Sequence, residues 1–163
     1  MESETLDWLS EKAPAFGELP EREKMAIMDF ALLWSFFESR CLGNKANIPQ
    51  IRDYAQQLPH TTVNSYEIDQ ISSYFRARYT ENGEYSYRYH HLRLERSGNP
   101  QEVTAMLLGG ADHREALIGC LAILYRYRNN LFHGEKWEHE IQGQQENFER
   151  ATSLLRWLMD QHT

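Results

Sequence analysis

The sequence predicts an all-α fold: an antiparallel bundle of about five to seven helices, with an irregular or hairpin-like excursion near residues 80–100. Two observations carry this prediction. Apolar residues recur at helical spacing along most of the chain, and Pro, Gly and Asn separate these stretches. With 163 residues, of which 41% are hydrophobic, the chain is long enough to bury a core as one domain spanning residues 1–163.

Two helices are expected in the N-terminal part. The first covers Glu4 to Lys12, and Pro14 ends it. Pro20 opens the second, which runs to about Leu42 and is closed by Gly43-Asn44. The second helix is apolar on two sides, one formed by Ile27, Phe30, Ala31, Trp34, Phe37 and Cys41 and the other by Met28, Leu32, Leu33 and Phe36. Such a helix is either buried on nearly all sides or shares one face with a partner.

The middle of the chain combines helical and strand-like patterns. A helix is expected from about Ile48 to Leu58. Residues 65–79 have helical spacing at first and then alternate, and alternation continues beyond Asn82-Gly83, a dipeptide typical of hairpin turns. We therefore expect a helix in the first half of this region and a strand-like or irregular second half.

Three further helices are expected after the break at residues 97–100. A short helix runs from Gln101 to Leu108. A core helix follows, with Asp112 as its expected N-cap and Glu115 three residues later, and it ends at Gly134. The last helix covers about Gln144 to Gln161.

The composition limits the kinds of partner. A net charge of −7 argues against broad, nonspecific binding of nucleic acid, although 13 of the 17 basic residues are Arg, which suits a focused phosphate site. No apolar run is long enough to cross a bilayer, and no signal sequence is recognisable, so we expect a cytoplasmic protein without membrane contact. Cys41 and Cys120 are expected to be reduced, buried thiols.

The core helix ends in the most informative segment of the chain, Arg128-Asn129-Asn130-Leu131-Phe132-His133-Gly134. Arg holds a phosphate through two parallel hydrogen bonds, and His transfers protons near neutral pH. Cutting RNA without a metal requires these two chemistries. The same residues also fit ordinary helix capping, in which cations interact with the negative end of the helix dipole and Gly ends the helix.

In this context the segment resembles the motif of the HEPN superfamily, small helical domains of which many are ribonucleases. That motif is Arg, a polar residue, a short spacer and His, and Arg128, Asn129 and His133 match it in order. The resemblance is specific over residues 121–136 and general elsewhere. It implies a HEPN-like bundle and a metal-independent endoribonuclease that acts as a homodimer. Such proteins commonly serve as toxins or in defence against phage, with an antitoxin or regulatory protein as a further partner.

Helix geometry bears on the homodimer. Five residues at about 100° each place Arg128 and His133 about 140° apart around a regular helix. Either the helix unwinds near His133, or two subunits contribute residues to one cleft. HEPN proteins resemble the second case, because they pair their motif helices across a two-fold axis.

The resemblance also implies roles for individual residues. The ribose 2′-hydroxyl attacks the adjacent phosphorus and leaves a 2′,3′-cyclic phosphate. His133 acts as general base or acid, Arg128 stabilises the phosphoryl charge, and Asn129 orients His133 or donates to a phosphate oxygen. Asn130 and Glu38, from the second helix, are supporting candidates, and a solvated helix end explains Glu38 equally well. No metal or cofactor is expected.

One position departs from the HEPN pattern. HEPN toxins that a nucleotidyltransferase inactivates typically carry Tyr two residues after the His, where this chain has Glu135. Regulation by that route is therefore not expected. Glu135, Glu138 and Glu140 also place negative charge beside the proposed site, which works against tight binding of RNA.

A second segment combines aromatic and basic residues suited to contact RNA, namely Tyr85, Tyr87, Arg88, Tyr89 and Arg93. Aromatic rings stack on bases and Arg contacts phosphates, although such a stretch is also compatible with an exposed hairpin face or with packing on its own domain. Nearby histidines, His90 and His91, have no spacing typical of metal ligands.

Three functions remain open from the sequence. The first is the endoribonuclease. The second is a non-catalytic HEPN-like module that binds a nucleotide or a protein partner, which the acidic residues after His133 favour. The third is a helical scaffold, for which changes in the motif alter stability alone.

Overall fold

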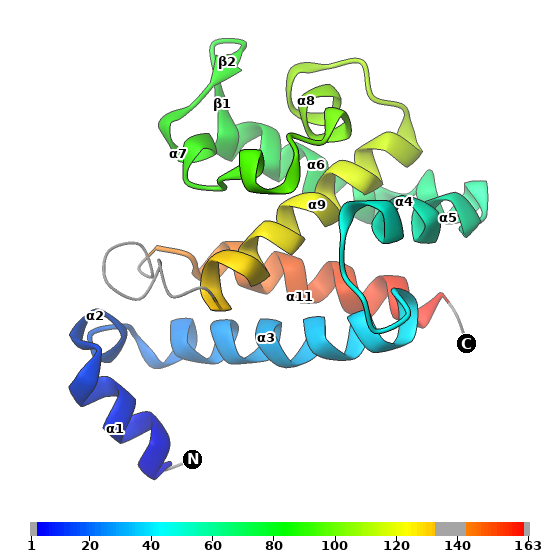
Figure 1. The fold of residues 1–163 in the computed structure, drawn as a ribbon. Coiled ribbons are helices and arrows are strands. Elements are labelled where there is room, and N and C mark those ends of the chain that lie inside the picture. The colour runs from blue at the N-terminus through cyan, green and yellow to red at the C-terminus, as the bar shows by residue number, and fades with distance from the viewer. Residues whose placement is uncertain (1–2, 133–142, 162–163) are drawn as a thin grey trace.

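The computed structural model describes residues 3–132 and 143–161, and it confirms an all-α protein (Figure 1). Seven of the helices in these residues have eight or more residues. The elements are α1 (Glu4–Lys12), α2 (Pro14–Gly17), α3 (Glu21–Cys41), α4 (Ile48–Gln57), α5 (His60–Val63), α6 (Tyr66–Tyr79), β1 (Thr80–Glu81), β2 (Glu84–Tyr85), α7 (Tyr87–His90), the 3₁₀ helix η1 (Leu94–Ser97), α8 (Gln101–Leu108), α9 (His113–Phe132) and α11 (Gln145–Asp160).

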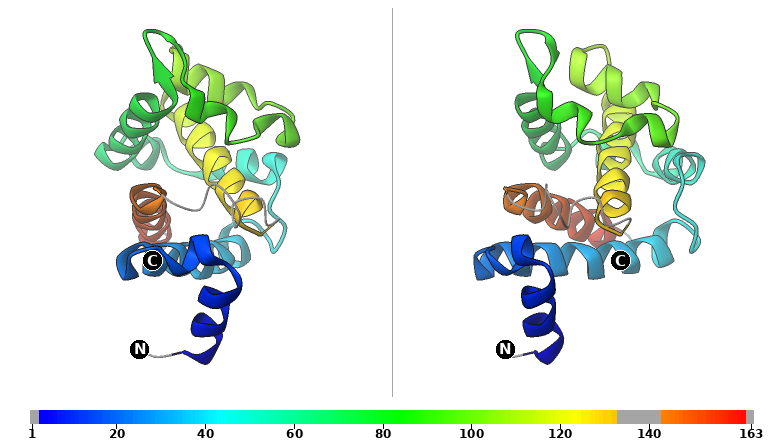
Figure 2. Two further views of the ribbon diagram at one scale, coloured as in Figure 1. Left: turned by 90° about the vertical axis from the view of Figure 1, so that its left-hand side faces the viewer. Right: turned by 60° about the vertical axis from the view of Figure 1, so that its left-hand side comes forward.

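Helices α3 and α11 lie side by side at one side of the molecule, and α9 connects them to a second group formed by α6, α8 and the β1–β2 hairpin (Figures 1 and 2). α3 and α11 run in the same direction, since Arg22 binds Glu149 at 3.1 Å near the start of both helices. This pair is an exception to the expected antiparallel arrangement. The long segment between the two helices, which holds most of the fold, lets α11 return parallel to α3.

Helix α9 is the centre of the core. Thirteen of its twenty residues are buried, as its nearly continuous apolar sequence predicts. Gly119 lets α8 approach it closely, because a Cβ at this position would lie 2.8 Å from the carbonyl oxygen of Glu102. The buried apolar side chains form one cluster, from Phe16 near the N-terminus to Leu158 in α11.

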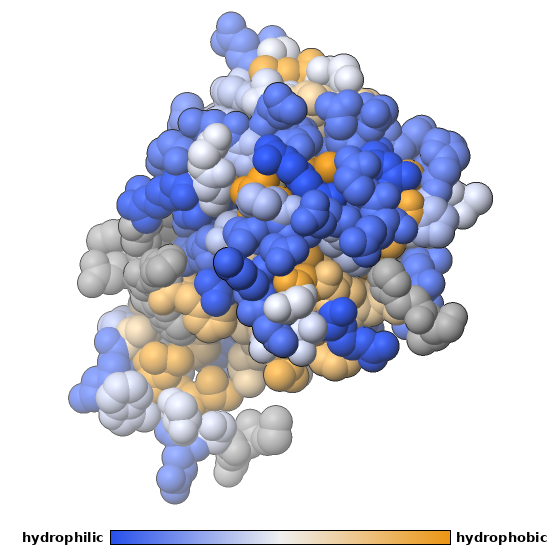
Figure 3. All heavy atoms as spheres, turned by 45° about the vertical axis from the view of Figure 1, so that its right-hand side comes forward, coloured by the Kyte–Doolittle hydropathy of each residue, from blue (hydrophilic) through white to orange (hydrophobic). Residues whose placement is uncertain are grey.

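Helix α3 is buried on one side only. Ile27, Phe30 and Trp34 lie in the core, whereas the opposite side exposes a row of large apolar residues. This row, the α3 stripe, consists of Met25 (53% exposed), Met28 (37%), Leu32 (77%) and Phe36 (50%). Figure 3 shows apolar surface gathered at the lower part of the molecule, where α3 and α11 lie. Of the two arrangements expected for this helix, the structure therefore excludes burial on nearly all sides.

Several predicted elements are confirmed with their boundaries. α1 and α8 cover the expected residues, and Asp112 caps α9 by accepting a hydrogen bond from the Glu115 N–H at 2.8 Å. The short helices α2, α5, α7 and η1 were not anticipated.

The expected hairpin-like excursion near residues 80–100 is confirmed by the β1–β2 hairpin, but it begins later than the alternating pattern at residues 75–79 indicates, because α6 remains helical to Tyr79. Phe75 and Tyr79, four residues apart, are both buried on the same helix face, so helical packing overrides the alternating pattern. The hairpin follows directly, with Asn82 and Gly83 at positive φ values of 54° and 79° in its turn.

Two further expectations concern membranes and thiols. No helix within residues 3–132 and 143–161 combines the length and hydrophobicity needed to span a bilayer. Neither Cys41 nor Cys120 forms a disulfide, and Cys120 is buried as expected, whereas Cys41 is only half-buried. Burial raises the pKa of Cys120 to about 12, so that this thiol stays protonated at neutral pH.

Candidate functional site

The last turn of α9 holds the described half of the Arg–His motif. Nη1 of Arg128 donates to Oδ1 of Asn129 at 2.8 Å, and the guanidinium carbon lies 5.0 Å from the ring centroid of Phe132. Phe132 is 58% exposed, so Arg128 lies between a buried amide and a solvent-facing ring. No carboxylate in residues 3–132 or 143–161 pairs with Arg128. Within the described residues, the remaining donors of the guanidinium therefore have no acceptor, and they suit binding of an external anion.

The other half of the motif is not placed. His133, Glu135, Glu138 and Glu140 lie outside the described residues, so the pairing of Arg128 with His133 stays a prediction. α9 remains helical through Phe132. Asn129 uses its oxygen to hold Arg128, which leaves its Nδ2 hydrogens for another acceptor.

Asn130, predicted as a supporting residue, belongs to a different set of contacts. Its oxygen accepts from Nη2 of Arg126 at 2.9 Å, and its Nδ2 donates to the carbonyl oxygens of Leu92 at 3.2 Å and His91 at 3.3 Å. Arg126 is 3% exposed and also donates to the Leu92 carbonyl and to Oγ of Ser97. Asn130 therefore fixes the segment after α7 against α9.

Sequence reasoning missed Arg126. Its signal is a second Arg two residues before Arg128, inside an otherwise buried helix, with an amide four residues later on the same face. Arg126 and Arg128 differ by about 200° in direction around α9. One therefore points into the fold and the other toward the end of the helix.

Glu38 makes a local contact. Its Oε1 accepts a hydrogen bond from the backbone N–H of Ala46 at 2.8 Å, which closes the loop between α3 and α4. Asn44 in this loop has a φ of 63°, so the chain turns back over the end of α3 and brings the N–H of Ala46 to Glu38. The described hydrogen bond of Glu38 is thus to Ala46 and not to Arg128. A contact of Glu38 with His133 stays a prediction, because His133 lies outside the described residues.

The aromatic-basic segment divides into two parts. Tyr85 and Tyr89 stack on each other with ring centroids 3.7 Å apart and planes at 2°, and the Tyr85 hydroxyl donates to Thr104 at 3.0 Å. Burial is the main cause of a raised pKa for Tyr89. These two rings serve the packing of their own domain. This outcome corresponds to the alternative that the sequence left open for them.

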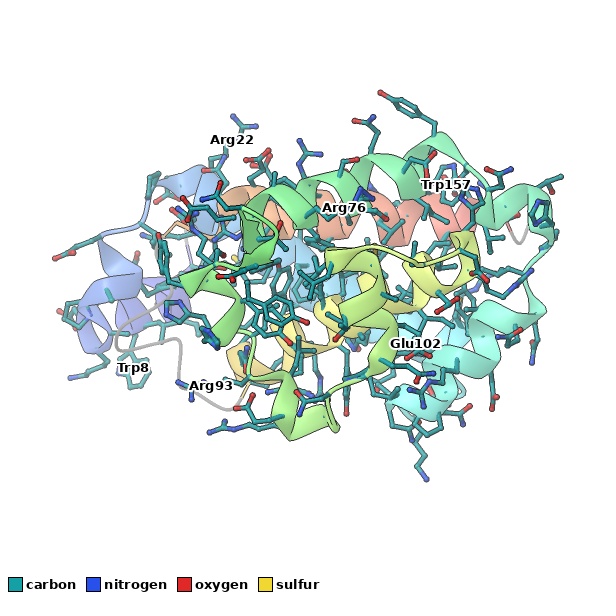
Figure 4. All side chains as sticks on the ribbon, turned by 90° about the horizontal axis from the view of Figure 1, so that it is seen from above. Trp8, Arg22, Arg76, Arg93, Glu102 and Trp157 are labelled. Carbon is teal, nitrogen blue, oxygen red and sulfur yellow. The ribbon has the colours of Figure 1, made fainter. Side chains whose placement is uncertain are left out.

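The other members of the segment are more accessible. Tyr87 is 65% exposed, and the guanidinium of Arg88 lies 4.9 Å from its ring centroid. Arg93 adopts a left-handed conformation at the start of η1, with φ 55° and ψ 48°. Figure 4 places Arg93 near the edge of the molecule. Among these residues, Arg88 and Tyr87 fit an RNA contact best.

Within residues 3–132 and 143–161, no three His, Cys, Asp or Glu side chains come together as ligands. The residues named above instead provide hydrogen-bond donors and aromatic faces, which suit an anionic ligand.

A separate cleft lies between α6, α8 and the start of α9. It has a volume of about 410 Å³, and its lining includes Ser72, Arg76, Gly109, Gly110 and His113. Clefts of this size accept small molecules. Arg76 donates through Nε to the Met106 carbonyl at 3.2 Å, so its Nη groups remain to bind a ligand.

Comparison of this chain with protein-family models, with curated proteins and with solved structures gives no match.

Proposed function

We propose that the protein is a metal-independent endoribonuclease of HEPN-like type, with a composite active site in a homodimer. The observation that supports this proposal most is the set of contacts that Arg128 makes. Its guanidinium is held by Asn129 and Phe132 at the end of α9, and no described carboxylate neutralises it. A guanidinium held in this way, without a carboxylate partner among the described residues, is suited to bind a phosphoryl group and to stabilise the charge that develops on it.

The reaction is a transesterification within RNA. His133 of one subunit takes the proton from the ribose 2′-hydroxyl, whose oxygen attacks the adjacent phosphorus. The bond from phosphorus to the 5′-oxygen breaks, and the second copy of His133 gives a proton to that leaving oxygen. The products are a 2′,3′-cyclic phosphate and a 5′-hydroxyl. Arg128 contacts the non-bridging oxygens, and Nδ2 of Asn129 donates to one of them or orients His133.

The test is cleavage of an RNA oligonucleotide by the purified full chain in excess EDTA. We expect cleavage of RNA with 2′,3′-cyclic phosphate ends, and none of the same sequence made as DNA, because DNA lacks the nucleophile. Cleavage of DNA, or cleavage that requires Mg²⁺, would contradict the mechanism. A protein inert on total RNA and without effect when expressed in cells would favour the alternative function.

The homodimer is supported by the α3 stripe. Four large apolar side chains on one helix face are costly to leave in water, and such patches mark interaction sites. A second copy of the chain would cover the stripe with an identical apolar surface, as an interface around a two-fold axis requires.

The charges beside the stripe also suit a second copy. A shallow hollow of about 570 Å³ continues the stripe toward α11, and its lining includes Asp29, Leu33 and Arg156. Asp29 and Arg156 are both exposed and have opposite charges. In a two-fold dimer, Asp29 of each copy can therefore face Arg156 of the other, which makes the surface complementary to itself.

The position of α9 links this interface to the motif. The last turns of α9 pack on α3, with the ring of Tyr125 centred 6.2 Å from Trp34 and that of Tyr127 centred 6.4 Å from Phe30. The stripe lies on the opposite side of α3 from these rings, so a dimer formed through it holds both α9 ends in one assembly but does not by itself place them in one cleft.

Substitution Leu32→Glu is expected to convert the dimer into a monomer, because it places a charge at the centre of the apolar contact. Leu32 is 77% exposed, so the fold of the subunit should be unaffected. Leu108→Glu is the matched control, since Leu108 is also exposed (45%) but lies on α8. Sedimentation velocity at micromolar concentration measures the outcome. A monomeric wild type, or a Leu32→Glu variant that stays dimeric, would contradict the proposed interface.

The alternative function is a binding module for a nucleotide, and the cleft beside Arg76 favours it. In that case Arg76→Gln lowers nucleotide affinity, while changes at Arg128 leave it unaltered. A role as toxin or phage-defence effector, with an antitoxin or other regulatory partner, remains part of the main proposal through the HEPN resemblance.

A further inference from the structure

A small polar cavity lies between the end of α6, α7 and α9. It has a volume of about 20 Å³. Its described lining includes Arg78, Tyr79, Arg88, His91, Tyr127 and Gln144, and none of the described lining residues is acidic. The cavity is thus surrounded by cationic and hydrogen-bonding groups.

Two tyrosines form one wall of the cavity. The hydroxyls of Tyr79 and Tyr127 lie 2.5 Å apart, and both residues are 3% exposed. Burial raises the pKa of Tyr79 to about 12 and that of Tyr127 well above its usual value, so both hydroxyls stay neutral at pH 7. The pair carries two protons, of which only one is needed for the bond between them. The second proton can be donated to another acceptor.

Arg78 supplies an unsatisfied donor. Its Nε is buried without a hydrogen-bond partner in the described part of the chain, and its guanidinium carbon lies 5.8 Å from the ring centroid of Tyr79. A buried N–H without an acceptor is unfavourable and uncommon in folded proteins. Arg88 is exposed, so it lies where a ligand enters. No described carboxylate pairs with Arg78 or Arg88.

We propose that this cavity binds one phosphate group. The volume suits a single oxygen-sized group, so one non-bridging oxygen enters while the rest of the phosphate stays at the mouth with Arg88 and His91. A phosphodiester monoanion and a phosphate monoester dianion are both strong acceptors without donors, which matches a lining rich in N–H and O–H groups. The phosphate comes either from the RNA backbone or from a nucleotide.

The cavity deepens the proposed function and rests on it for RNA as the source of the phosphate. Tyr127, which lines the cavity, directly precedes Arg128 in α9, so the cavity and the motif share residues of the same helix end. A backbone phosphate held here would fix the register of the strand for cleavage at a neighbouring phosphate. Binding itself does not depend on cleavage.

The test measures binding by a full-length protein that cannot cleave, His133→Ala, with labelled single-stranded RNA at several salt concentrations. Adding Arg88→Gln or Arg78→Gln is expected to weaken binding about tenfold and to reduce the slope of log K against log salt by about 0.7, the share of one phosphate. Arg88 is exposed, so its variant should fold normally. Arg150→Gln is the matched control, because Arg150 lies on α11, pairs with Glu146 at 3.0 Å and does not line the cavity.

Two further arms identify the source of the phosphate. Inorganic phosphate and adenosine monophosphate are each compared with chloride at equal ionic strength, with the thermal midpoint as readout. If Arg88→Gln weakens RNA binding but leaves stabilisation by inorganic phosphate and by adenosine monophosphate unchanged, the source is the RNA backbone. If it also abolishes stabilisation by the mononucleotide, a nucleotide phosphate binds as well. The proposal is overturned if both cavity variants bind all three probes like the parent protein, or if Arg150→Gln weakens binding as much as they do. An inactive wild type leaves these outcomes readable, because none of them requires cleavage.

Discussion

Replacing Arg128 by Ala is expected to lower the rate of RNA cleavage by about 100- to 1,000-fold, the usual effect of removing one group that stabilises a developing oxyanion. Folding should be retained. Arg128 contacts only Asn129 and the exposed ring of Phe132 among the described residues, and it is half-buried. The expected loss of stability is therefore below about 1 kcal/mol.

The pattern across substitutions at this position is diagnostic. Arg128→Lys should retain part of the activity, because it keeps the positive charge but not the bidentate hydrogen bonds to phosphate. Arg150→Ala is a suitable control. Arg150, on α11, pairs with Glu146 at 3.0 Å and stacks on Tyr74, so its loss removes a surface contact of another element.

The measurements are the initial cleavage rate and the denaturant midpoint of the wild type and of the Arg128→Ala, Arg128→Lys and Arg150→Ala variants. Full activity in a folded Arg128→Ala variant would mean that the motif is a helix C-terminus without a catalytic role. A loss of activity together with a large loss of stability would assign Arg128 to the fold instead. His133→Ala should abolish cleavage independently, since the proposed mechanism takes every proton transfer through that residue.

The sequence predicted those parts of the fold that depend on local signals. The N-cap at Asp112, the break before Gln101 and the Asn82-Gly83 turn involve residues only a few positions apart, and each is found in the structure. The parallel pairing of α3 with α11 was not predictable in this way. It depends on how the long segment between these helices packs, which no local pattern encodes.

Single residues of the candidate site show the same limit, which is that local sequence patterns do not encode tertiary packing. Arg126 and Arg128 are the same amino acid, as are Asn129 and Asn130, yet one member of each pair fixes the fold and the other lies at the end of α9. Sequence identifies the residue types. Which side of the helix each one faces follows from the helical repeat, but what lies on that side follows only from tertiary packing.

The aromatic-basic segment was interpreted from composition, which does not reveal pairing between side chains. Tyr85 and Tyr89 use their faces on each other, and this stack removes them from base recognition. The composition of the segment does not point to Arg78, because the hairpin separates Arg78 from it in the sequence. The hairpin brings it to the same cavity as Arg88.

The second large effect concerns stability. Arg126→Met is expected to destabilise the protein by about 3 kcal/mol, because it removes a buried charged donor and takes one hydrogen bond from each of three described acceptors. Those acceptors are the Leu92 carbonyl at 3.0 Å, Oγ of Ser97 at 3.1 Å and Oδ1 of Asn130 at 2.9 Å. Met retains much of the side-chain volume, so the loss reports hydrogen bonding more than packing.

For a chain of this length, about 3 kcal/mol corresponds to a fall of roughly 6–12 °C in the thermal midpoint. Arg128→Ala is the matched control, since it lies two residues away on the same helix and should shift the midpoint much less. An Arg126→Met variant that unfolds at the wild-type denaturant concentration would show that the contacts of Arg126 contribute nothing to stability.

A double-mutant cycle separates the network from its parts. Asn130→Ala alone removes the acceptor of Arg126 and the donor to the carbonyls of His91 and Leu92. Because Arg126 and Asn130 bond to each other and share the Leu92 carbonyl, the double variant should lose less stability than the sum of the two single variants, with a coupling of about 1 kcal/mol or more.

The contacts of Arg126 and Asn130 also affect the phosphate cavity, which His91 and Leu92 line. If Arg126 and Asn130 hold that segment in place, Arg126→Met should also weaken RNA binding at temperatures where the protein is still folded.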